Sequence, residues 1–223
     1  MAKSIAVIGL GVLGRVLVKE LADAGADVLA IDSDIEMIEL VKDAATYAVR
    51  MDATDVRMLR EQNLEDVDAV VLTIGDNFEA LILTIQELLH LGVTNIYARA
   101  TSLTHRRILE RMGIEHIISP EEDAAVRLAR RLVNPGLLDY LDLSEDYQIV
   151  EVSAPTRLIG KTLVELELTR RYHVNVVTIR RKVDGRDTIV GVPTAETRIE
   201  PEDVLILLGK PDDIRRLIDQ NQG

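Results

Sequence analysis

The feature of the sequence that most constrains its fold is a glycine motif, G-x-G-x-x-G, at residues 9–14. The motif directly follows an apolar run at residues 5–8 and opens an amphipathic stretch, which is the context of a dinucleotide-binding turn between a strand and a helix. In such a turn, Gly9 permits the sharp bend, Gly11 lets the backbone approach a phosphate, and Gly14 lets the helix pack closely on the sheet. The free N–H groups of the helix N-terminus favour phosphate, so the motif predicts a nucleotide site.

A single acid strengthens this interpretation. Asp32 follows the second apolar run and lies about 20 residues beyond the motif, where dinucleotide-binding folds place a ribose-binding acid. A carboxylate there accepts hydrogen bonds from ribose hydroxyls and repels a 2′-phosphate, so NADP is not expected. The alternative interpretation is a glycine-rich turn without a ligand and a simple loop acid.

Apolar runs and amphipathic stretches alternate from residue 5 to residue 118. The predicted strands are residues 5–8, 28–31, 47–49, 69–72, 96–99 and 116–118. The predicted helices are residues 13–24, 35–44, a short helix capped by Thr54, 77–91 and 103–112. This alternation predicts an α/β fold with a doubly wound parallel Rossmann sheet in the strand order 3-2-1-4-5-6. Hydrophobic residues make up 47% of the chain but aromatic residues only 3%, so the core must be aliphatic, as in strands buried on both faces.

The alternation stops after residue 118. Ser119 and Pro120 are a predicted N-cap and first position of a helix that reaches about residue 133, and Asn-Pro-Gly at residues 134–136 breaks it. We therefore predict a nucleotide-binding domain at residues 1–136 and a smaller α+β C-terminal lobe at residues 137–223. In the lobe, we predict strands at 148–152, 174–181 and 204–208, helices at 162–172 and 212–219, and an Asp-Gly turn at 184–185.

Charge and composition exclude several classes of function. The formal net charge of −12 argues against binding to nucleic acid or to anionic lipid, because both need a basic face. The absence of cysteine excludes a disulfide framework, a thiolate metal site and a cysteine nucleophile. The sequence has no signal-peptide layout and no apolar run of about 18 residues, so we expect a soluble, cytoplasmic protein.

Ligand contacts in a doubly wound sheet are expected at the carboxyl ends of the strands. Taken alone, each loop residue at these ends is explained equally well as a cap or a surface residue, but together they would ring one crevice. Thr73 follows the fourth strand and belongs to the same crevice. The candidate cofactor-binding residues are Gly9, Gly11, Val12, Leu13, Gly14, Asp32, Ser33, Asp52, Ala53, Thr54, Ile74, Gly75 and Arg99.

The sequence shows no recognisable catalytic group beside this site. No tyrosine has a lysine four residues later, and there is no G-x-S-x-G, H-E-x-x-H or lysine-bearing phosphate loop. We interpret the four histidines, His90, His105, His116 and His173, as structural. We therefore expect a sensor that is not an enzyme. An NAD-dependent oxidoreductase and a nucleotide-responsive module for another partner remain as alternatives.

Several segments, taken in order, resemble the regulatory subunits of Ktr- and Trk-type potassium uptake systems, the RCK or KTN proteins. The segments are residues 7–14, 29–32, 52–54, 96–100, 112–121, 158–163, 191–193 and 203–209. Their order and spacing cover nearly the whole chain and are far more specific than the glycine motif.

The resemblance implies a cytosolic regulatory subunit. It implies a homodimer that assembles into an octameric ring at the inner face of the cell membrane, on a potassium channel or transporter subunit that is KtrB- or TrkH-like. The first domain would bind ADP, ATP or NAD(H), and the occupant would change the shape of the ring and so gate the pore. ATP-sensing members carry arginine directly after the second glycine, whereas this sequence has Val12 there and Arg15 as its nearest arginine. The identity of the nucleotide is therefore left open.

The resemblance also implies roles for residues outside the motif. Arg99 would lie near the phosphates, and Glu121 near Mg²⁺ or Ca²⁺ between bound nucleotides, although a first-turn acid favoured by the helix dipole explains Glu121 as well. The helix of residues 121–133 would pack on the partner subunit. Its apolar face is Val126, Ala129 and Val133, and its solvated or interfacial arginines are Arg127, Arg130 and Arg131. Some relatives bind cyclic di-AMP in the C-terminal lobe, for which the strand to test holds Asn175, Val176 and Val177.

Overall fold

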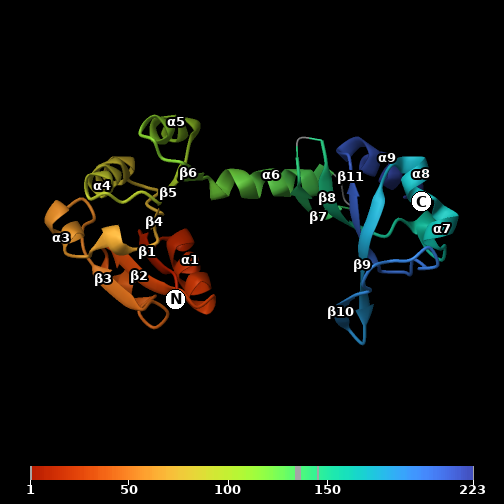
Figure 1. Cartoon of the computed structure of the whole chain (residues 1–223), viewed down its shortest axis with the longest axis horizontal. Coiled ribbons are helices and arrows are strands. Elements are labelled where there is room, and N and C mark those ends of the chain that lie inside the picture. The colour runs from red at the N-terminus through yellow and green to blue at the C-terminus, as the bar shows by residue number, and fades with distance from the viewer. Residues whose placement is uncertain (1, 134–136, 145, 223) are drawn as a thin grey trace. The chain divides into compact units, whose positions relative to one another are not determined.

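The computed structural model describes residues 2–133, 137–144 and 146–222 of the chain (Figure 1). The chain divides into two compact units, Met1–Glu122 and Asp123–Gly223. The break predicted at residues 134–136 lies outside the described residues, and the domain boundary after residue 136 stays a prediction. None of the helices in the described ranges is long and apolar enough to cross a bilayer.

The first unit contains a six-stranded parallel sheet in the order β3-β2-β1-β4-β5-β6, which confirms the predicted Rossmann topology. Ile8, the last residue of β1, pairs with Ile31 of β2 and with Leu72 of β4, so these three strands end at the same level. All four residues of β4 are buried, as expected for a strand covered on both faces. The strands are β1 (Ser4–Ile8), β2 (Asp27–Asp32), β3 (Tyr47–Arg50), β4 (Ala69–Leu72), β5 (Ile96–Arg99) and β6 (His116–Ile118).

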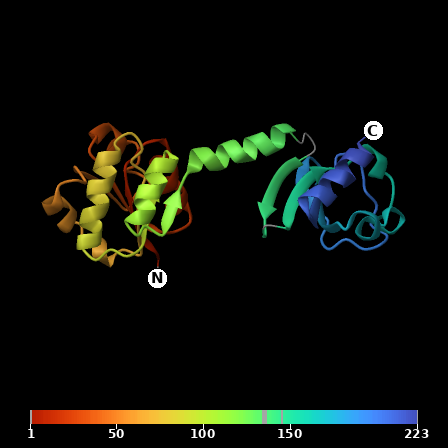
Figure 2. The same cartoon turned by 90° about the horizontal axis from the view of Figure 1, so that it is seen from above.

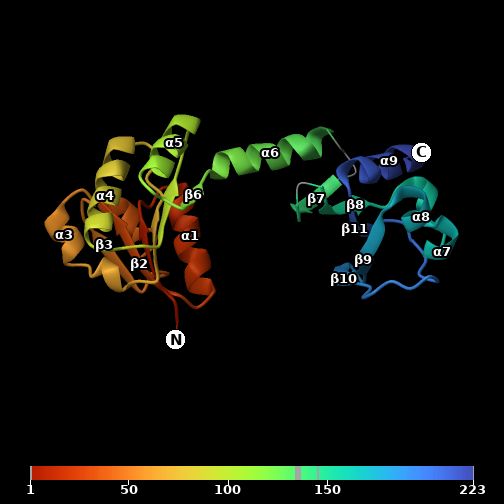
Figure 3. The ribbon, with the colours of Figure 1, turned by 45° about the horizontal axis from the view of Figure 1, so that its top comes forward.

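Helices cover both faces of this sheet. Val18 of α1 and Ile38 of α2 belong to one apolar core, and Ile85 of α4 and Leu109 of α5 belong to the core on the other face. Figures 2 and 3 show α4 and α5 lying side by side. The helices are α1 (Val12–Asp23), α2 (Ile35–Glu39), α3 (Val56–Arg60), the 3-10 turn η1 (Leu64–Asp66), α4 (Phe78–His90) and α5 (Leu103–Arg111).

Two local predictions in this unit are wrong. Asp55, and not Thr54, caps α3 by accepting the N–H of Arg57, because the hydroxyl of Thr54 is used in a bond to Asp52. The helix predicted at residues 35–44 ends at Glu39. Beyond it, the N–H groups of residues 41 and 44 donate to carbonyls three residues earlier and those of residues 42 and 45 to carbonyls four residues earlier, so the segment continues as successive turns and not as a regular helix.

The second unit is built on a five-stranded antiparallel sheet in the order β10-β9-β11-β8-β7. Asp184 and Gly185 both have positive φ, 51° and 76°, and form the predicted turn between β9 and β10. β7 and β10 were not predicted. The elements are α6 (Pro120–Val133), which contains the division between the units, β7 (Leu137–Asp142), β8 (Gln148–Ser153), η2 (Thr156–Leu158), α7 (Leu163–Leu166), α8 (Leu168–Tyr172), β9 (Asn175–Val183), β10 (Arg186–Ile189), β11 (Val204–Gly209) and α9 (Pro211–Asn221).

The continuous helix predicted at residues 162–172 is also wrong, because Glu167 adopts a left-handed conformation with φ 47°. Leu166 and Leu168 flank this residue, and both are buried in the core of the unit. Residues two apart do not share a face of one helix, so the break between α7 and α8 lets both side chains reach the core. Thr162 and Glu165 form a capping box that fixes the start of α7.

A buried ion pair ties together the segments around β9 and β11. Asp203 is fully buried and accepts two hydrogen bonds from the guanidinium of Arg181, at 2.8 and 2.7 Å, in a bidentate arrangement. Its second oxygen also accepts the N–H of Glu200 at 2.7 Å. The paired carboxylate is the largest cause that raises the pKa of Arg181.

We predict that Asp203→Asn destabilises the second unit by about 2–3 kcal/mol, because it removes the buried bidentate partner of Arg181 and leaves that guanidinium only the more exposed carboxylate of Glu200. Urea unfolding of the full chain measures this loss. Native-state hydrogen exchange of the β9 and β11 amides then shows whether it falls on these strands. The matched control is Asp213→Asn, which removes a more exposed pair with Arg216 and should cost at most about 1 kcal/mol. Equal losses in the two variants would contradict the assignment of Asp203 as a structural anchor.

Candidate functional site

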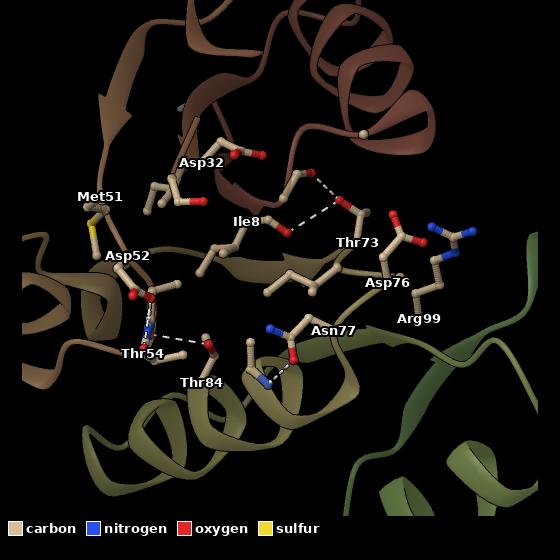
Figure 4. A pocket seen from close by; sticks show the side chains of 18 residues that line it. Ile8, Asp32, Met51, Asp52, Thr54, Thr73, Asp76, Asn77, Thr84 and Arg99 are labelled. Atoms are coloured by element: carbon tan, nitrogen blue, oxygen red, sulfur yellow. Dashed lines mark hydrogen bonds between the residues drawn. The ribbon is translucent and has the colours of Figure 1, made fainter. Parts of the chain in front are cut away.

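A pocket of about 400 Å³ opens at the carboxyl ends of the parallel strands in the first unit (Figure 4). Ten of the candidate residues line it: Gly9, Gly11, Asp32, Ser33, Asp52, Ala53, Thr54, Ile74, Gly75 and Arg99. Thr73, which was expected in the same crevice, also lines it. The structure thus brings together residues from the carboxyl ends of five of the six strands and the loops that follow them, and their role in ligand binding stays a prediction.

Steric crowding fixes the glycine turn between β1 and α1. Gly9 has φ 93°, a conformation that L side chains rarely adopt. A Cβ atom on Gly14 would lie 2.0 Å from the carbonyl oxygen of Gly9, whereas a Cβ on Gly11 would have no neighbour within 4 Å. The hydroxyl of Thr73 donates to the carbonyl of Gly9 and so joins the turn to the end of β4. The open side of the turn at Gly11 is therefore the side that a ligand can approach.

Val12, Leu13 and Gly14 are the first residues of α1 and are not among the lining residues. Gly11 is the N-cap and has no side chain to accept the N–H groups of the first turn. The first turn also contains no acid. The positive end of the helix is therefore not neutralised locally, and any contact from these residues to a ligand would come from the backbone.

The carboxylate of Asp32 is held by two backbone N–H groups. One oxygen accepts the N–H of Leu10 at 2.6 Å, and the other accepts the N–H of Asp34 at 2.8 Å. Each carboxylate oxygen has a further lone pair, so Asp32 can still accept hydrogen bonds from a ligand. The two bonds orient the side chain at the mouth of the pocket.

Asp52 and Thr54 form the wall after β3. One oxygen of Asp52 accepts both the N–H of Thr54 at 2.9 Å and its hydroxyl at 2.7 Å. The backbone N–H and then the hydroxyl of Thr54 hold the pKa of Asp52 below its usual value. Thr84 of α4 donates to the carbonyl of Ala53 at 3.2 Å, which fastens this loop to the helix.

Arg99 forms the opposite wall at the end of β5. Its guanidinium lies against the backbone of Gly75, where a Cβ atom would come within 2.4 Å of a terminal nitrogen. The same guanidinium donates to Glu121 in the first turn of α6. The backbone N–H of Glu121 itself, followed by Arg99, lowers the pKa of Glu121.

The lining is acidic. Asp32, Asp52 and Asp76 line the pocket, and Arg99 is the one cation among the described lining residues. Figure 4 shows Asp76 and Arg99 at one end of the pocket and Asp52 at the other. The carboxylates of this lining can accept hydrogen bonds from hydroxyl and amino groups of a ligand. Only one side chain of the described lining, Arg99, carries a positive charge that can balance the charge of a phosphate.

Sequence reasoning missed several lining residues. Asp76 and Asn77 follow Gly75 in the loop after β4. Because ligand contacts are expected at the carboxyl ends of the strands, these two residues would have been predicted if two more loop residues had been included. Thr84 lies inside α4 and no sequence signal marks it. The remaining unpredicted residues are Ile8, Ile31, Met51 and Ala80.

Other candidate groups lie elsewhere. Arg15 donates to the carbonyl of Leu10 at 2.9 Å and contacts the sulfur of Met37, and it does not line the pocket. His105 stacks on Phe78, and no histidine is among the described lining residues. No group of three His, Cys, Asp or Glu side chains that could hold a metal ion occurs within residues 2–133, 137–144 and 146–222.

The predicted interfacial face of α6 carries exposed apolar side chains, among them Val126 and Val133. Arg131 donates to the carbonyl of Leu138 at 2.8 Å. The side chain of Arg130 lies outside the described residues. Contact of this helix with a partner subunit stays a prediction, as does the role of the β9 residues in binding cyclic di-AMP.

Two family domains match the chain: the TrkA-N domain over residues 5–120 and the TrkA-C domain over residues 147–221. The Ktr system potassium uptake protein C of Bacillus subtilis (strain 168) is 40% identical over 216 residues, which cover 97% of this chain and 96% of that protein. The Ktr system potassium uptake protein A of the same organism is 34% identical over 221 residues, or 99% of this chain and 97% of that protein.

A solved structure of the GsuK RCK domain has a similar fold. The superposition covers 100% of the chain described here and 48% of the GsuK chain, with a TM-score of 0.64 and 18% sequence identity. At this level of identity, the similarity shows the fold alone.

We predict that Gly14→Ala destabilises the first unit by about 1–3 kcal/mol, because the added methyl group must displace the Gly9 carbonyl. The matched substitution Gly11→Ala places its methyl group in open space at φ −59° and should cost less, at most about 1 kcal/mol, because alanine is only a poorer N-cap than glycine. Thermal unfolding of the two variants measures the difference. If Gly11→Ala is as destabilising as Gly14→Ala, the steric assignment of the turn is wrong.

Proposed function

This chain belongs to the family of Ktr and Trk potassium-uptake regulatory proteins with a TrkA-N and a TrkA-C domain, and on this premise we propose that it is a nucleotide-sensing regulatory subunit that gates a membrane potassium channel or transporter. The observation that carries the proposal is the 40% identity to a Ktr potassium uptake protein over almost the full length of both chains. The open pocket at the glycine turn supplies a place for the regulating ligand.

The proposed ligand is an adenine nucleotide, with ADP, ATP and NAD(H) as the candidates. Its phosphates would lie over Gly11 and the N–H groups at the start of α1, and its ribose hydroxyls would donate to Asp32. Arg99 would bind the phosphates from the opposite wall. Ser33, Asp52, Ala53 and Thr54 would surround the nucleoside, as their positions in the lining support. The GsuK channel, which has the same fold, has been solved with NAD bound, so NADH belongs among the ligands to test.

Gating requires that the nucleotide bind two conformations of the assembly with different affinities. We propose that the chain forms a homodimer, and then an octameric ring, on a KtrB- or TrkH-like pore subunit. The exposed apolar face of α6 supports such self-association, because exposed contiguous apolar surface favours burial against a partner. The chain would act by changing shape, without turning the nucleotide over.

Two further ligands belong to the proposal. Glu121 is proposed to approach Mg²⁺ or Ca²⁺, but the described residues of one chain supply no complete set of metal ligands, so the other ligands must come from outside the chain. Cyclic di-AMP is proposed to bind the second unit near Asn175, Val176 and Val177. Asn175 accepts a hydrogen bond from Thr169 at 2.8 Å, which orders the start of β9.

Reconstitution tests the proposed function. The chain is purified from native membranes with its partner, and the partner is placed in liposomes with and without the chain. We expect the flux of potassium to depend on the chain and to change when ADP, ATP or NADH is added. Mass spectrometry identifies any nucleotide retained by the chain. The proposal would be refuted by a partner that conducts no potassium, or by a potassium flux that depends on neither the chain nor the nucleotide.

We predict that Asp32→Ala weakens nucleotide binding by about 1–3 kcal/mol, through loss of hydrogen bonds to a charged acceptor. Titration calorimetry with ADP and NADH measures the change. Asp27→Ala is the matched control, because Asp27 begins the same strand at its opposite, amino end and should have no effect on affinity. Unchanged nucleotide affinity of the Asp32→Ala variant would contradict the proposed contact between the ribose and Asp32.

A further inference from the structure

Arg99 is paired with a carboxylate that lies outside the pocket lining. It is the one cation among the described lining residues, and it faces a lining with three carboxylates. Its terminal nitrogen donates to Glu121, which lies in the first turn of α6 and is not itself part of the lining. The charge that a phosphate would need is therefore neutralised by a carboxylate behind the pocket wall.

When Arg99 is paired with Glu121, one of its hydrogen-bond donors has no acceptor among the described residues. Its Nε atom is buried and has no hydrogen-bond partner within the described part of the chain. The guanidinium is seated against Gly75, where even a Cβ atom would come within 2.9 Å of Cζ. A buried donor without a partner is unfavourable, and a move of the guanidinium toward the pocket would free Nε to donate to a ligand oxygen.

The bond to Glu121 is of a kind that a ligand can displace. The Glu121 side chain is 60% exposed, so water weakens its attraction for Arg99. A terminal phosphate offers the planar guanidinium of Arg99 two oxygen acceptors and up to two negative charges, which makes stronger charge-assisted hydrogen bonds. The exchange of partner becomes more favourable as the charge on the phosphate group rises.

We propose that Glu121 competes with the ligand's phosphate for Arg99 and so sets how strongly the pocket discriminates between nucleotides by their phosphate charge. This inference rests on the proposed nucleotide site. Without a divalent cation, Glu121 acts here as a positioning residue, because it acts through Arg99 and is not among the residues that line the nucleotide pocket. Binding transfers Arg99 from Glu121 to the phosphate and releases the first turn of α6 from the pocket wall.

Titration calorimetry in EDTA, with adenosine, AMP and ADP as probes, tests the competition without divalent cations. Glu121→Gln keeps the shape of the side chain and removes its charge. We expect ADP to bind about three- to fivefold more tightly to this variant than to the wild type, AMP to gain less, and adenosine to gain nothing.

Glu122→Gln is the matched control. Glu122 is the next residue of the same helical turn and is 58% exposed, but its carboxylate lies 3.7 Å from Arg106 and is not paired with Arg99. This variant loses the same charge and should leave ADP affinity within about twofold of the wild type. Thermal unfolding of each variant checks that it is folded, and Glu121→Ala replaces the glutamine variant should that one fail to fold.

A double-mutant cycle then decides whether the effect passes through Arg99. In an Arg99→Met background, Glu121→Gln should give no further gain in ADP affinity. The inference is overturned if Glu121→Gln leaves ADP binding unchanged or weaker, if Glu122→Gln or adenosine shows the same gain, or if the gain persists without Arg99. A wild-type chain that binds neither AMP nor ADP would instead refute the proposed nucleotide site itself.

Discussion

The contact between residues 9 and 14 controls the geometry of the first unit. The carbonyl of Gly9 occupies the place where a side chain at residue 14 would begin, so α1 approaches β1 as closely as backbone allows. That approach sets the N-terminus of α1 at the level where β1, β2 and β4 end together. The helix dipole, the Asp32 carboxylate and the loop after β4 thereby meet at one edge of the sheet. A pocket at this edge follows from the topology, and its chemistry follows from the loops.

Three of the charged groups that line this pocket, Asp32, Asp52 and Arg99, are paired with neighbouring groups of the chain. Three carboxylates and one arginine line it, and the arginine is shared with a glutamate outside. The hydrogen bonds of Asp32 and Asp52 are made to backbone and to a neighbouring threonine, which orders the loops. Binding and release of a ligand would then change which groups neutralise one another. Under the proposed regulatory role, such a change of partners would be one source of the difference in affinity between two states.

The sequence predicted those parts of the structure that depend on burial pattern and on glycine. The strand order and the Asp184-Gly185 turn follow from apolar runs and from residues that favour positive φ. β10 could not be predicted in this way, because all four of its residues are exposed and carry no alternating pattern. The break at Glu167 could not be predicted, because glutamate rarely adopts the left-handed conformation and no local turn signal marks this position. In the site, loop positions were predictable, whereas the pairing of Arg99 with Glu121 depends on how two distant segments meet.

The carboxylate of Asp203 has a consequence for how the second unit opens. It holds Arg181 near the end of β9 and the N–H of Glu200 just before β11, and it has no exposed surface. Any local fraying that separates these segments breaks hydrogen bonds to a charged acceptor and leaves the carboxylate without its partners inside the protein, which is costly. Partial openings of this sheet are therefore suppressed, and the strands joined by Asp203 should come apart together as one cooperative unit. A change at β9 or at the start of β11 can therefore pass between these two strands without being lost in local disorder.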